Sequence, residues 1–451
     1  MIRLTWVQPE DLIGHELRQA AEDGRDVADI AARWRAAGGH DAPPRAGASD
    51  PEAARLRGLA QDLLDELAEI PSPLDEPSDL PAIITACPAW PAHPSALPTT
   101  AGGRGLVVDP ARVLGAWLGR AAGCVLGKPV EKIPREGIRQ IAEATGNWPM
   151  RGWFTAKGLP DDIARRWPWN RRSAVNSLAE NIDGIPEDDD LNYPLLALTV
   201  LERHGRAFTT EDVAKLWLDE LPAGRTFTAE RVAYRNLLDG VEPPHTASLR
   251  NPFREWIGAL IRADVYGWVN PGDPATAAEY AWRDARLTHT ANGIYGAMFA
   301  AAMCAASLVA TSPEEVVAAG LSVVPAGSRL HEAVRLAAED AAADKDFERV
   351  VNGLYERHGS LHWVHTINNA ALVAAALIHG RGDFTATIAG AVAGGWDTDS
   401  AAATAGSIAG ALNGGVPDQW RMRDSLASSL TGFDGVSLVE LARRTQEMMH
   451  P

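Results

Sequence analysis

Most of the chain shows the spacing of amphipathic helices, and few segments alternate between apolar and polar residues as strands do. One helical pattern covers about residues 10–37 and another covers residues 50–70, where leucines recur at steps of three and four. The leucines on this second face are Leu56, Leu59, Leu63, Leu64 and Leu67. From residue 106 onward almost every segment has the helical period. The pattern predicts an all-α, compact multi-helix globule with an N-terminal helical appendage.

A proline-rich stretch at residues 71–105 separates the first helical patterns from the rest. Its prolines are Pro71, Pro73, Pro77, Pro81, Pro88, Pro91, Pro94 and Pro98. Proline lacks an amide donor and opposes regular helix, so this stretch is predicted to be an extended linker. We therefore expect a helical appendage over residues 1–70, a linker over 71–105 and a catalytic domain over 106–451.

Glycines recur at four-residue steps in two of the predicted helices. The first helix starts at Asp109-Pro110, a typical N-cap followed by proline. Its glycines are Gly115, Gly119, Gly123 and Gly127, and a second row consists of Gly406, Gly410 and Gly414, with Ala402 one step earlier. Because a helical glycine costs about 1 kcal/mol relative to alanine, such rows indicate close packing of helices.

The 451 residues carry more acidic than basic side chains, which bears on the partners that the protein can bind. There are 42 Lys and Arg against 59 Asp and Glu, a net charge of −17. This excludes a sequence-independent nucleic-acid binder and argues against docking on an anionic membrane. Three scattered cysteines supply neither a disulfide framework nor a zinc knuckle, and the N-terminus lacks the pattern of a signal peptide. The longest weakly polar stretch, residues 297–310, is too short to span a bilayer, so we expect a soluble cytoplasmic protein.

Two acidic clusters, at residues 186–194 and 394–400, each come directly before an apolar helical pattern. A single Asp-rich loop is ordinarily a solvated helix start, where the helix dipole favours negative charge. Here the second cluster lies among glycine and alanine, which a solvated surface loop does not need. Carboxylates and hydroxyls without nearby His or Cys favour magnesium, calcium or manganese over zinc. The two clusters therefore predict a site for a hard divalent cation.

Four segments together resemble the ADP-ribosylglycohydrolase family, which includes the dinitrogenase reductase-activating glycohydrolases. They are GAWLGRAAGCVLGKPVE, PEDDDLNYPLLAL, THTANGIYGAMFAAAMCAA and GGWDTDSAAATAGSIAGAL, and they occur in the expected order. The resemblance covers about residues 106–430 and leaves residues 1–105 outside. It implies an all-α globule that holds two magnesium ions, which manganese replaces in some members.

The resemblance also implies site residues. The family's metal ligands fall on Asp188, Asp189, Asp190, Asp397, Asp399 and Ser400. The family's glutamate falls on Glu131, and we expect Glu131 and Asp190 to act in catalysis. Metal ions and carboxylates of this kind suit hydrolysis of a glycosidic bond at the ribose anomeric carbon, which breaks through an oxocarbenium-like transition state.

Three positions depart from the family's pattern. Asp188 replaces a hydroxyl residue and adds a charge, Leu191 replaces a threonine, and Cys124 replaces a common aspartate. These departures point to a branch of the family that acts on something other than ADP-ribosylated protein.

Other residues near the motifs are predicted to contact the substrate. These are His289, Thr366, Asn368, Gly395, Trp396 and Thr398. A lone histidine before an apolar helix is more often a packing residue, and Thr366 and Asn368 have an alternative role as capping groups.

The leading hypothesis is a magnesium-dependent glycohydrolase that cleaves an N- or O-ribosyl linkage of ADP-ribosyl type. Its partner would be an ADP-ribosylated protein or a small nucleotide-derived molecule, with no nucleic acid and no membrane involved. The alternatives are a small-molecule nucleosidase or ribosidase, and a non-catalytic ADP-ribose-binding module. Glu131 discriminates against the last, because a binding module has no need of a carboxylate there.

Overall fold

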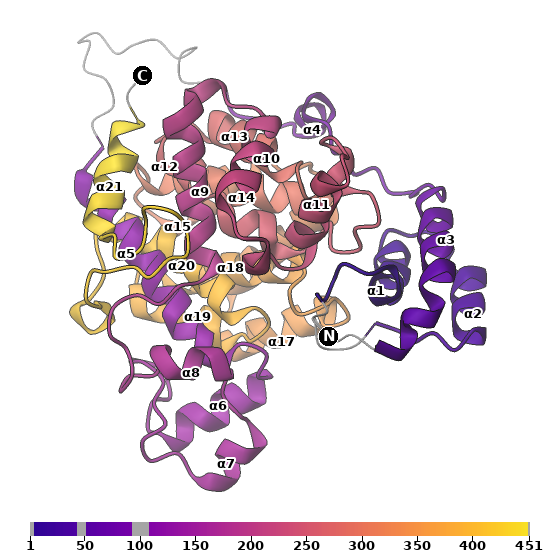
Figure 1. The fold of residues 1–451 in the computed structure, drawn as a ribbon. Coiled ribbons are helices and arrows are strands. Elements are labelled where there is room, and N and C mark those ends of the chain that lie inside the picture. The colour runs from indigo at the N-terminus through magenta and orange to yellow at the C-terminus, as the bar shows by residue number, and fades with distance from the viewer. Residues whose placement is uncertain (1–3, 43–50, 93–107, 450–451) are drawn as a thin grey trace.

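Helices are the only regular elements in the part of the chain that the computed structural model describes, residues 4–42, 51–92 and 108–449 (Figure 1). Strand-like pairing in these ranges is limited to isolated bridges, such as the one between Trp256 and His365. The prediction of an all-α protein is therefore confirmed.

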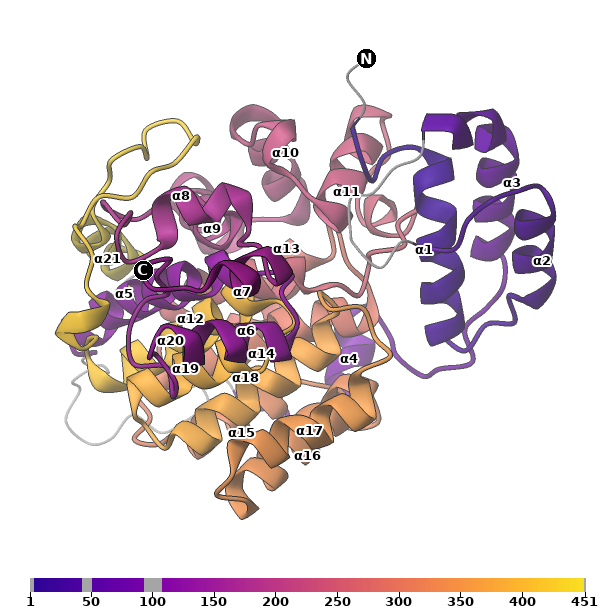
Figure 2. The ribbon, with the colours of Figure 1, turned by 90° about the horizontal axis from the view of Figure 1, so that it is seen from below.

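The first helices form a small lobe at one side of the molecule in both views (Figures 1 and 2). They are α1 (Pro9–Glu22), α2 (Ala28–Ala36), the 3₁₀ helix η1 (Pro51–Leu56) and α3 (Arg57–Ala68). The single helical pattern expected over residues 10–37 is wrong, because the chain turns at Gly24, whose φ of +75° suits glycine. The leucine face of the second pattern is buried as predicted, except for the partly exposed Leu59.

The proline-rich segment is not extended throughout its described part, residues 71–92, which corrects the prediction of a linker without helix. The rest of the predicted linker, residues 93–105, lies outside the described residues. It contains α4 (Leu80–Ala86), whose N-cap Asp79 accepts a hydrogen bond from the Ala82 amide. Proline is tolerated there because Pro81 lies in the first turn, where the amide has no partner within the helix. The Trp282 indole donates to the Ser78 carbonyl at 2.9 Å, so this segment packs on the main body. The division of the chain into appendage, linker and catalytic domain stays a prediction.

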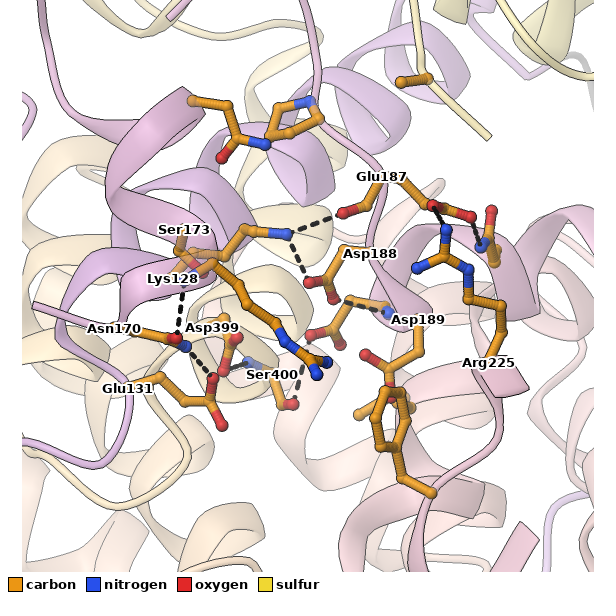
Figure 3. Close-up of a pocket in the computed structure, with 18 of the residues that line it drawn as sticks. Lys128, Glu131, Asn170, Ser173, Glu187, Asp188, Asp189, Arg225, Asp399 and Ser400 are labelled. Carbon is orange, nitrogen blue, oxygen red and sulfur yellow. Dashed lines mark hydrogen bonds and ion pairs between the residues drawn. The ribbon is translucent and has the colours of Figure 1, made fainter. Parts of the chain in front are cut away.

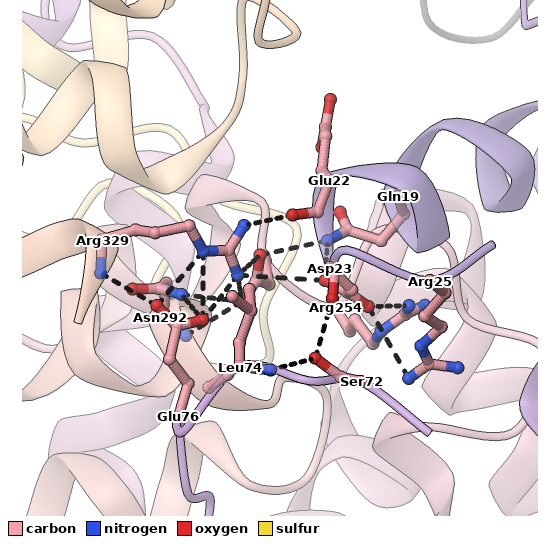
Figure 4. A network of polar contacts seen from close by, with 12 residues as sticks. Gln19, Glu22, Asp23, Arg25, Ser72, Leu74, Glu76, Arg254, Asn292 and Arg329 are labelled. Carbon is pink, nitrogen blue, oxygen red and sulfur yellow. Dashed lines mark hydrogen bonds and ion pairs between the residues drawn. The ribbon is translucent and has the colours of Figure 1, made fainter. Parts of the chain in front are cut away.

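Buried charges join the N-terminal lobe to the main body (Figure 4). The Arg254 guanidinium donates to Glu16 at 2.8 Å and to Asp23 at 2.6 Å, and all three residues are buried. Arg329 contacts both Glu76 and Glu255, at 2.6 and 3.0 Å. Because buried charges need partners, this network holds α1 against the main body.

The core of the main body consists of helices rich in alanine and glycine. They are α5 (Pro110–Gly127), α14 (Ala291–Ser307), α18 (Thr366–Gly380), α19 (Phe384–Ala393) and α20 (Thr398–Asn413). Nearly every residue of α14 and α18 is buried, as expected for helices that are apolar on all sides. In the described ranges no helix combines the length and apolarity that a membrane span requires.

The remaining helices surround this core. They are η3 (Lys128–Val130), α6 (Arg135–Ala144), α7 (Asp161–Arg166), α8 (Arg171–Ser177), α9 (Asp189–His204), η4 (Gly205–Ala207), α10 (Thr210–Glu220), η5 (Ala223–Arg225), α11 (Thr228–Leu238), η6 (His245–Ala247), η7 (Ile257–Arg262), α12 (Asp264–Trp268), α13 (Pro274–Ala285), α15 (Pro313–Leu321), α16 (Arg329–Ala343), α17 (Phe347–His358), η8 (Asp418–Trp420) and α21 (Leu438–Glu447).

Helices α5 and α20 lie antiparallel with their backbones in direct contact. A Cβ atom on Gly123 would lie 1.8 Å from the Ala402 carbonyl oxygen, and one on Gly119 would lie 2.0 Å from that of Gly406. No side chain fits at such distances, so the prediction of two tightly packed glycine rows is confirmed. At the end of α5, the Thr398 hydroxyl donates to the Gly127 carbonyl at 2.9 Å, which places the end of α5 beside the start of α20.

Candidate functional site

The two acidic clusters form the starts of α9 and α20, and these starts meet in space (Figure 3). Asp188 is the N-cap of α9 and accepts a hydrogen bond from the Asp190 amide at 3.0 Å. The Ser400 hydroxyl, in the first turn of α20, donates to Asp190 Oδ2 at 3.2 Å. Carboxylates that are about 200 residues apart in the sequence thereby gather at one place.

Arg120, on α5, contacts the start of α9 at this junction. Its side chain is fully buried in α5, and its Nε donates to the Asp190 carbonyl at 2.7 Å while Nη1 donates to Asp264 at 2.8 Å. It also contacts the Ile261 carbonyl. Arg120 therefore ties α9, η7 and α12 to α5 and holds α9 at its first turn.

The carboxylates crowd one another strongly enough to shift their ionisation. Burial raises the pKa of Asp189 well above its ordinary value, and the charges of Asp188 and Asp190 raise it further. Burial and the neighbouring charges of Glu131 and Asp188 raise the pKa of Asp399 to about 7. For Asp397, burial and the charge of Asp399 likewise raise the pKa well above the usual range. Such a cluster favours protons or a bound cation.

Lys128 provides a positive charge inside the site. Its side chain is 5% exposed, and Nζ lies 2.6 Å from Asp188 Oδ2 and 2.8 Å from the Glu187 carbonyl oxygen. Burial works against the charge of both groups, but their mutual attraction prevails: the pKa of Lys128 lies above its ordinary value and that of Asp188 below. Asp188 is therefore paired with a lysine ammonium, whereas Asp190 lies 3.4 Å from the Arg120 guanidinium.

Glu131 follows η3, at the point where Pro129 has ended the helical path of α5. Its carboxylate accepts a hydrogen bond from Asn170 Nδ2 at 2.6 Å and pairs with Lys132 at 2.9 Å (Figure 3). Asn170 is itself the N-cap of α8, so its side chain is anchored by helix geometry. Glu131 is thus held in one orientation at the edge of the acidic cluster.

A cavity of about 1350 Å³ connects these groups. Its walls include all three aspartates of the first cluster, Asp397, Asp399 and Ser400 of the second, and Lys128 and Glu131. The N-terminal segment also contributes, because Trp6 lies in the wall beside Phe227 and Arg231. The predicted metal ligands and the predicted catalytic carboxylates therefore share a single cleft.

The donor set fits a hard divalent cation. Carboxylate oxygens of Asp188 and Asp190 lie with Cys124 Sγ within 4.8 Å of one another, the one such group found among the described residues. Burial and the charge of Asp188 raise the pKa of the Cys124 thiol well above its usual value, so the sulfur stays protonated and is a poor ligand. Oxygen ligands from the aspartates and Ser400 remain, which is the set that Mg²⁺ and Mn²⁺ prefer.

The family model for ADP-ribosylglycohydrolase matches residues 108–449. This chain belongs to the ADP-ribosylglycohydrolase family. Members of this family are glycosyl hydrolases and are generally metal-dependent, so the prediction of a hydrolase acting on ribosyl bonds is confirmed. The match leaves the N-terminal lobe outside, as the sequence motifs do.

The chain is similar to two other proteins. An uncharacterized protein of Archaeoglobus fulgidus is 29% identical over 308 residues, which is 67% of this chain and 88% of that protein. A solved structure described as an ADP-ribosylglycohydrolase-related protein complex is 23% identical, with a TM-score of 0.45, and the match covers 75% of this chain and 98% of that one.

Six residues predicted to contact the substrate do not line the cleft. His289 is buried, its Nδ1 lies 2.5 Å from the Thr288 hydroxyl, and burial lowers its pKa well below the ordinary value. Thr366 and Asn368 are buried in the first turn of α18, where Asn368 donates to the His362 carbonyl. The structure thus favours packing and backbone bonding for these three.

The other three lie beside the late cluster and shape its backbone. Trp396 stacks on Tyr355 with ring centroids 4.3 Å apart, and Gly395, with φ of +77°, has the Tyr355 hydroxyl against it. Thr398 bonds to Gly127, as described above. Substrate contact by these six residues stays a prediction.

Sequence reasoning missed several residues of the site. Glu187 accepts hydrogen bonds from Asn192 and the Ser429 amide and pairs with Arg225 at 2.9 Å, so it ties the early cluster to two distant loops. Lys128 could have been predicted, because it lies three residues before Glu131 in the same motif. Asn170 and Arg225 had none, because they belong to segments outside every motif.

Proposed function

We propose that this chain is a divalent-metal-dependent glycohydrolase that cleaves an N- or O-ribosyl linkage of ADP-ribosyl type, in a modified protein or in a small nucleotide-derived molecule. The observation that carries the proposal is the contact between Ser400 and Asp190, which gathers both acidic clusters on one wall of a cleft beside Glu131. A cation would relieve the repulsion among these carboxylates, which raises the pKa of several of them.

The metal would be Mg²⁺ or Mn²⁺. Its ligands in this proposal come from Asp188, Asp189, Asp190, Asp397, Asp399 and Ser400. When bound, the cation supplies positive charge that orients ribose hydroxyls and polarises the reacting groups.

Glu131 would act as the general base that takes a proton from the attacking water. Asn170 and Lys132 hold its carboxylate at the edge of the cluster, which is the fixed geometry that proton transfer requires. Asp190 is the second candidate for proton transfer, because Ser400 and Arg120 hold it on the same wall. Charge build-up at the anomeric carbon would be stabilised by the surrounding carboxylates.

The size of the cleft favours an ADP-ribosyl group over a nucleoside. Its volume of about 1350 Å³ exceeds the roughly 300–1,000 Å³ that is usual for small-molecule sites. A nucleoside would leave most of this volume to water, whereas the larger ADP-ribosyl group would fill more of it.

The test uses the full chain with peptides ADP-ribosylated on arginine (N-linked) or serine (O-linked), and with adenosine as the nucleoside substrate. We expect release of ADP-ribose in MgCl₂ or MnCl₂, loss of release in EDTA and recovery when the cation is restored. Release that persists in EDTA contradicts metal dependence. Tight binding of ADP-ribose without hydrolysis of any substrate identifies a binding module instead, and cleavage of adenosine alone identifies a nucleosidase.

A further inference from the structure

Asp188 and Lys128 form an ion pair within the acidic cluster. The residues of the pair come from different helices, Lys128 from the end of α5 and Asp188 from the start of α9. Lys128 Nζ lies 2.6 Å from Asp188 Oδ2, and the same nitrogen donates to the Glu187 carbonyl at 2.8 Å. Two acceptors therefore hold the buried ammonium in place.

Asp188 belongs to the one group of three or more Asp, Glu, His or Cys ligand atoms that converge in the described part of the chain. Oxygens of Asp188 and Asp190 lie within 4.8 Å of one another and of Cys124 Sγ, and no other such group occurs in the described ranges. The ammonium contacts one oxygen of Asp188, while the other oxygen accepts from the Asp190 amide at 3.0 Å. Both oxygens of this carboxylate are therefore already engaged by protein donors.

The family resemblance implies a hydroxyl residue at position 188, where this chain has an aspartate. A hydroxyl brings no charge, whereas Asp188 adds one, and Lys128 supplies the opposite charge at hydrogen-bond distance. The fixed ammonium would repel a divalent ion placed next to it. Because Lys128 already neutralises the charge of Asp188, that carboxylate would attract the ion less.

Among the described residues, no lysine or arginine forms an ion pair with Asp397 or Asp399. Lys132 pairs with Glu131 instead, at 2.9 Å. Asp397 and Asp399 lie in the wall of the cleft, and Ser400 adds a hydroxyl oxygen beside Asp190. This side of the cluster retains what a cation needs.

We propose that the Lys128 ammonium takes the place of one of the two divalent ions that the family resemblance implies, so that this chain binds a single divalent ion on the side of Asp397, Asp399 and Ser400. The inference rests on the metal dependence in the proposed function. It makes Lys128 a permanent part of the metal centre. It also narrows the ligand set of the proposed function, because Asp188 holds Lys128 instead of ligating metal.

The test is the stoichiometry of Mn²⁺ binding to the full chain, measured by titration calorimetry and by electron paramagnetic resonance. For the unmodified protein we expect one Mn²⁺ per chain and the six-line spectrum of an isolated ion. Lys128→Ala frees Asp188 and opens its space, so a second Mn²⁺ should bind and the spectrum should broaden through spin coupling. Lys128→Gln, which keeps a hydrogen-bond donor without charge, serves as the second variant should the alanine variant fold poorly by circular dichroism.

Lys157→Ala is the matched control, because Lys157 is exposed and does not line the cleft, so the substitution removes the same charge far from the acidic cluster. The Lys157→Ala variant should still bind one Mn²⁺. Two ions bound to the unmodified protein overturn this proposal and leave the proposed function intact. One ion in every folded variant, with unchanged affinity, also overturns it, because Lys128 would then not occupy a cation position. No Mn²⁺ bound to any of them overturns both this proposal and metal dependence.

Discussion

The hydroxyl of Ser400 donates to Asp190 Oδ2 at 3.2 Å across 210 residues of sequence. This contact joins the first turn of α20 to the first turn of α9, so neither cluster of acids acts alone. It exists because α5 and α20 approach until their backbones touch, and because Arg120 on α5 binds the Asp190 carbonyl from the other side.

Removing one carboxylate from each cluster tests the joint site. Asp189→Asn and Asp397→Asn should each lower Mg²⁺ affinity by about tenfold or more, because substitutions even outside the direct ligands cost roughly 10–100-fold. Calorimetry of Mg²⁺ binding measures the effect, with the exposed Asp161→Asn as a control at unchanged affinity. Normal affinity in both variants would show that the clusters do not share a cation.

Glu131→Gln tests the proposed general base. Its surface pair with Lys132 is worth at most about 1 kcal/mol, so fold and metal binding should persist. Turnover of the ADP-ribosylated peptide should fall by roughly 10²-fold or more, the usual scale for a general acid–base group. Full activity in this variant would remove Glu131 from the mechanism and direct attention to Asp190.

Gly123→Ala tests whether the glycine row positions the site. The new Cβ would lie 1.8 Å from the Ala402 carbonyl oxygen, so α5 and α20 must separate. We expect a loss of about 1–3 kcal/mol in the free energy of unfolding, the usual cost of overpacking, together with weaker Mg²⁺ binding. Gly58→Ala in α3 is the matched control: nothing lies within 4 Å of its Cβ, so it should stabilise by up to about 1 kcal/mol. Urea unfolding of both variants makes the comparison.

The docking of the N-terminal lobe should depend on Arg254. Glu16→Gln combined with Asp23→Asn leaves its buried guanidinium without a carboxylate, which should cost about 3–5 kcal/mol in unfolding free energy. Asp29→Asn breaks the exposed pair with Arg33 and should change stability by less than about 1 kcal/mol. Equal stability of the two proteins would mean that the lobe is not held by this network.

The same interface should weaken in acid. His15 lies with its ring centroid 5.0 Å from that of Phe253, and burial, followed by the charge of Arg18, lowers its pKa to about 3. The unfolded chain takes up this proton near pH 6.5, whereas the folded chain does not. The stability contributed by neutral His15 is therefore complete above pH 6.5 and is lost as the pH falls toward 3.

His15→Phe should make this loss shallower by up to about 1.4 kcal/mol per pH unit, since one titrating group disappears. Urea unfolding between pH 7.5 and 5 gives the slopes. The exposed His245→Gln should keep the slope of the unmodified protein. Identical slopes in all three proteins would place the acid sensitivity elsewhere.

Local signals in the sequence determined much of this protein. The helical period predicted an all-α fold, the glycine rows predicted the contact of two helices, and Asp109 caps α5 by accepting from the Ala111 amide as its position indicated. These features depend on neighbours within a few residues or on a repeated spacing, so the pattern itself carries them. The acidic motifs likewise identified the two helix starts that meet in the cleft.

Tertiary structure alone decided which residues complete the site and which only resemble site residues. Asn170, Arg225 and Trp6 reach the cleft from segments without a motif, because chain packing places them there. His289 had the chemistry of a site residue, yet packing buried it beside Thr288, away from the cleft. Lys128 is the sharpest case: its partner Asp188 is 60 residues away, and only the folded backbone brings their opposite charges to 2.6 Å.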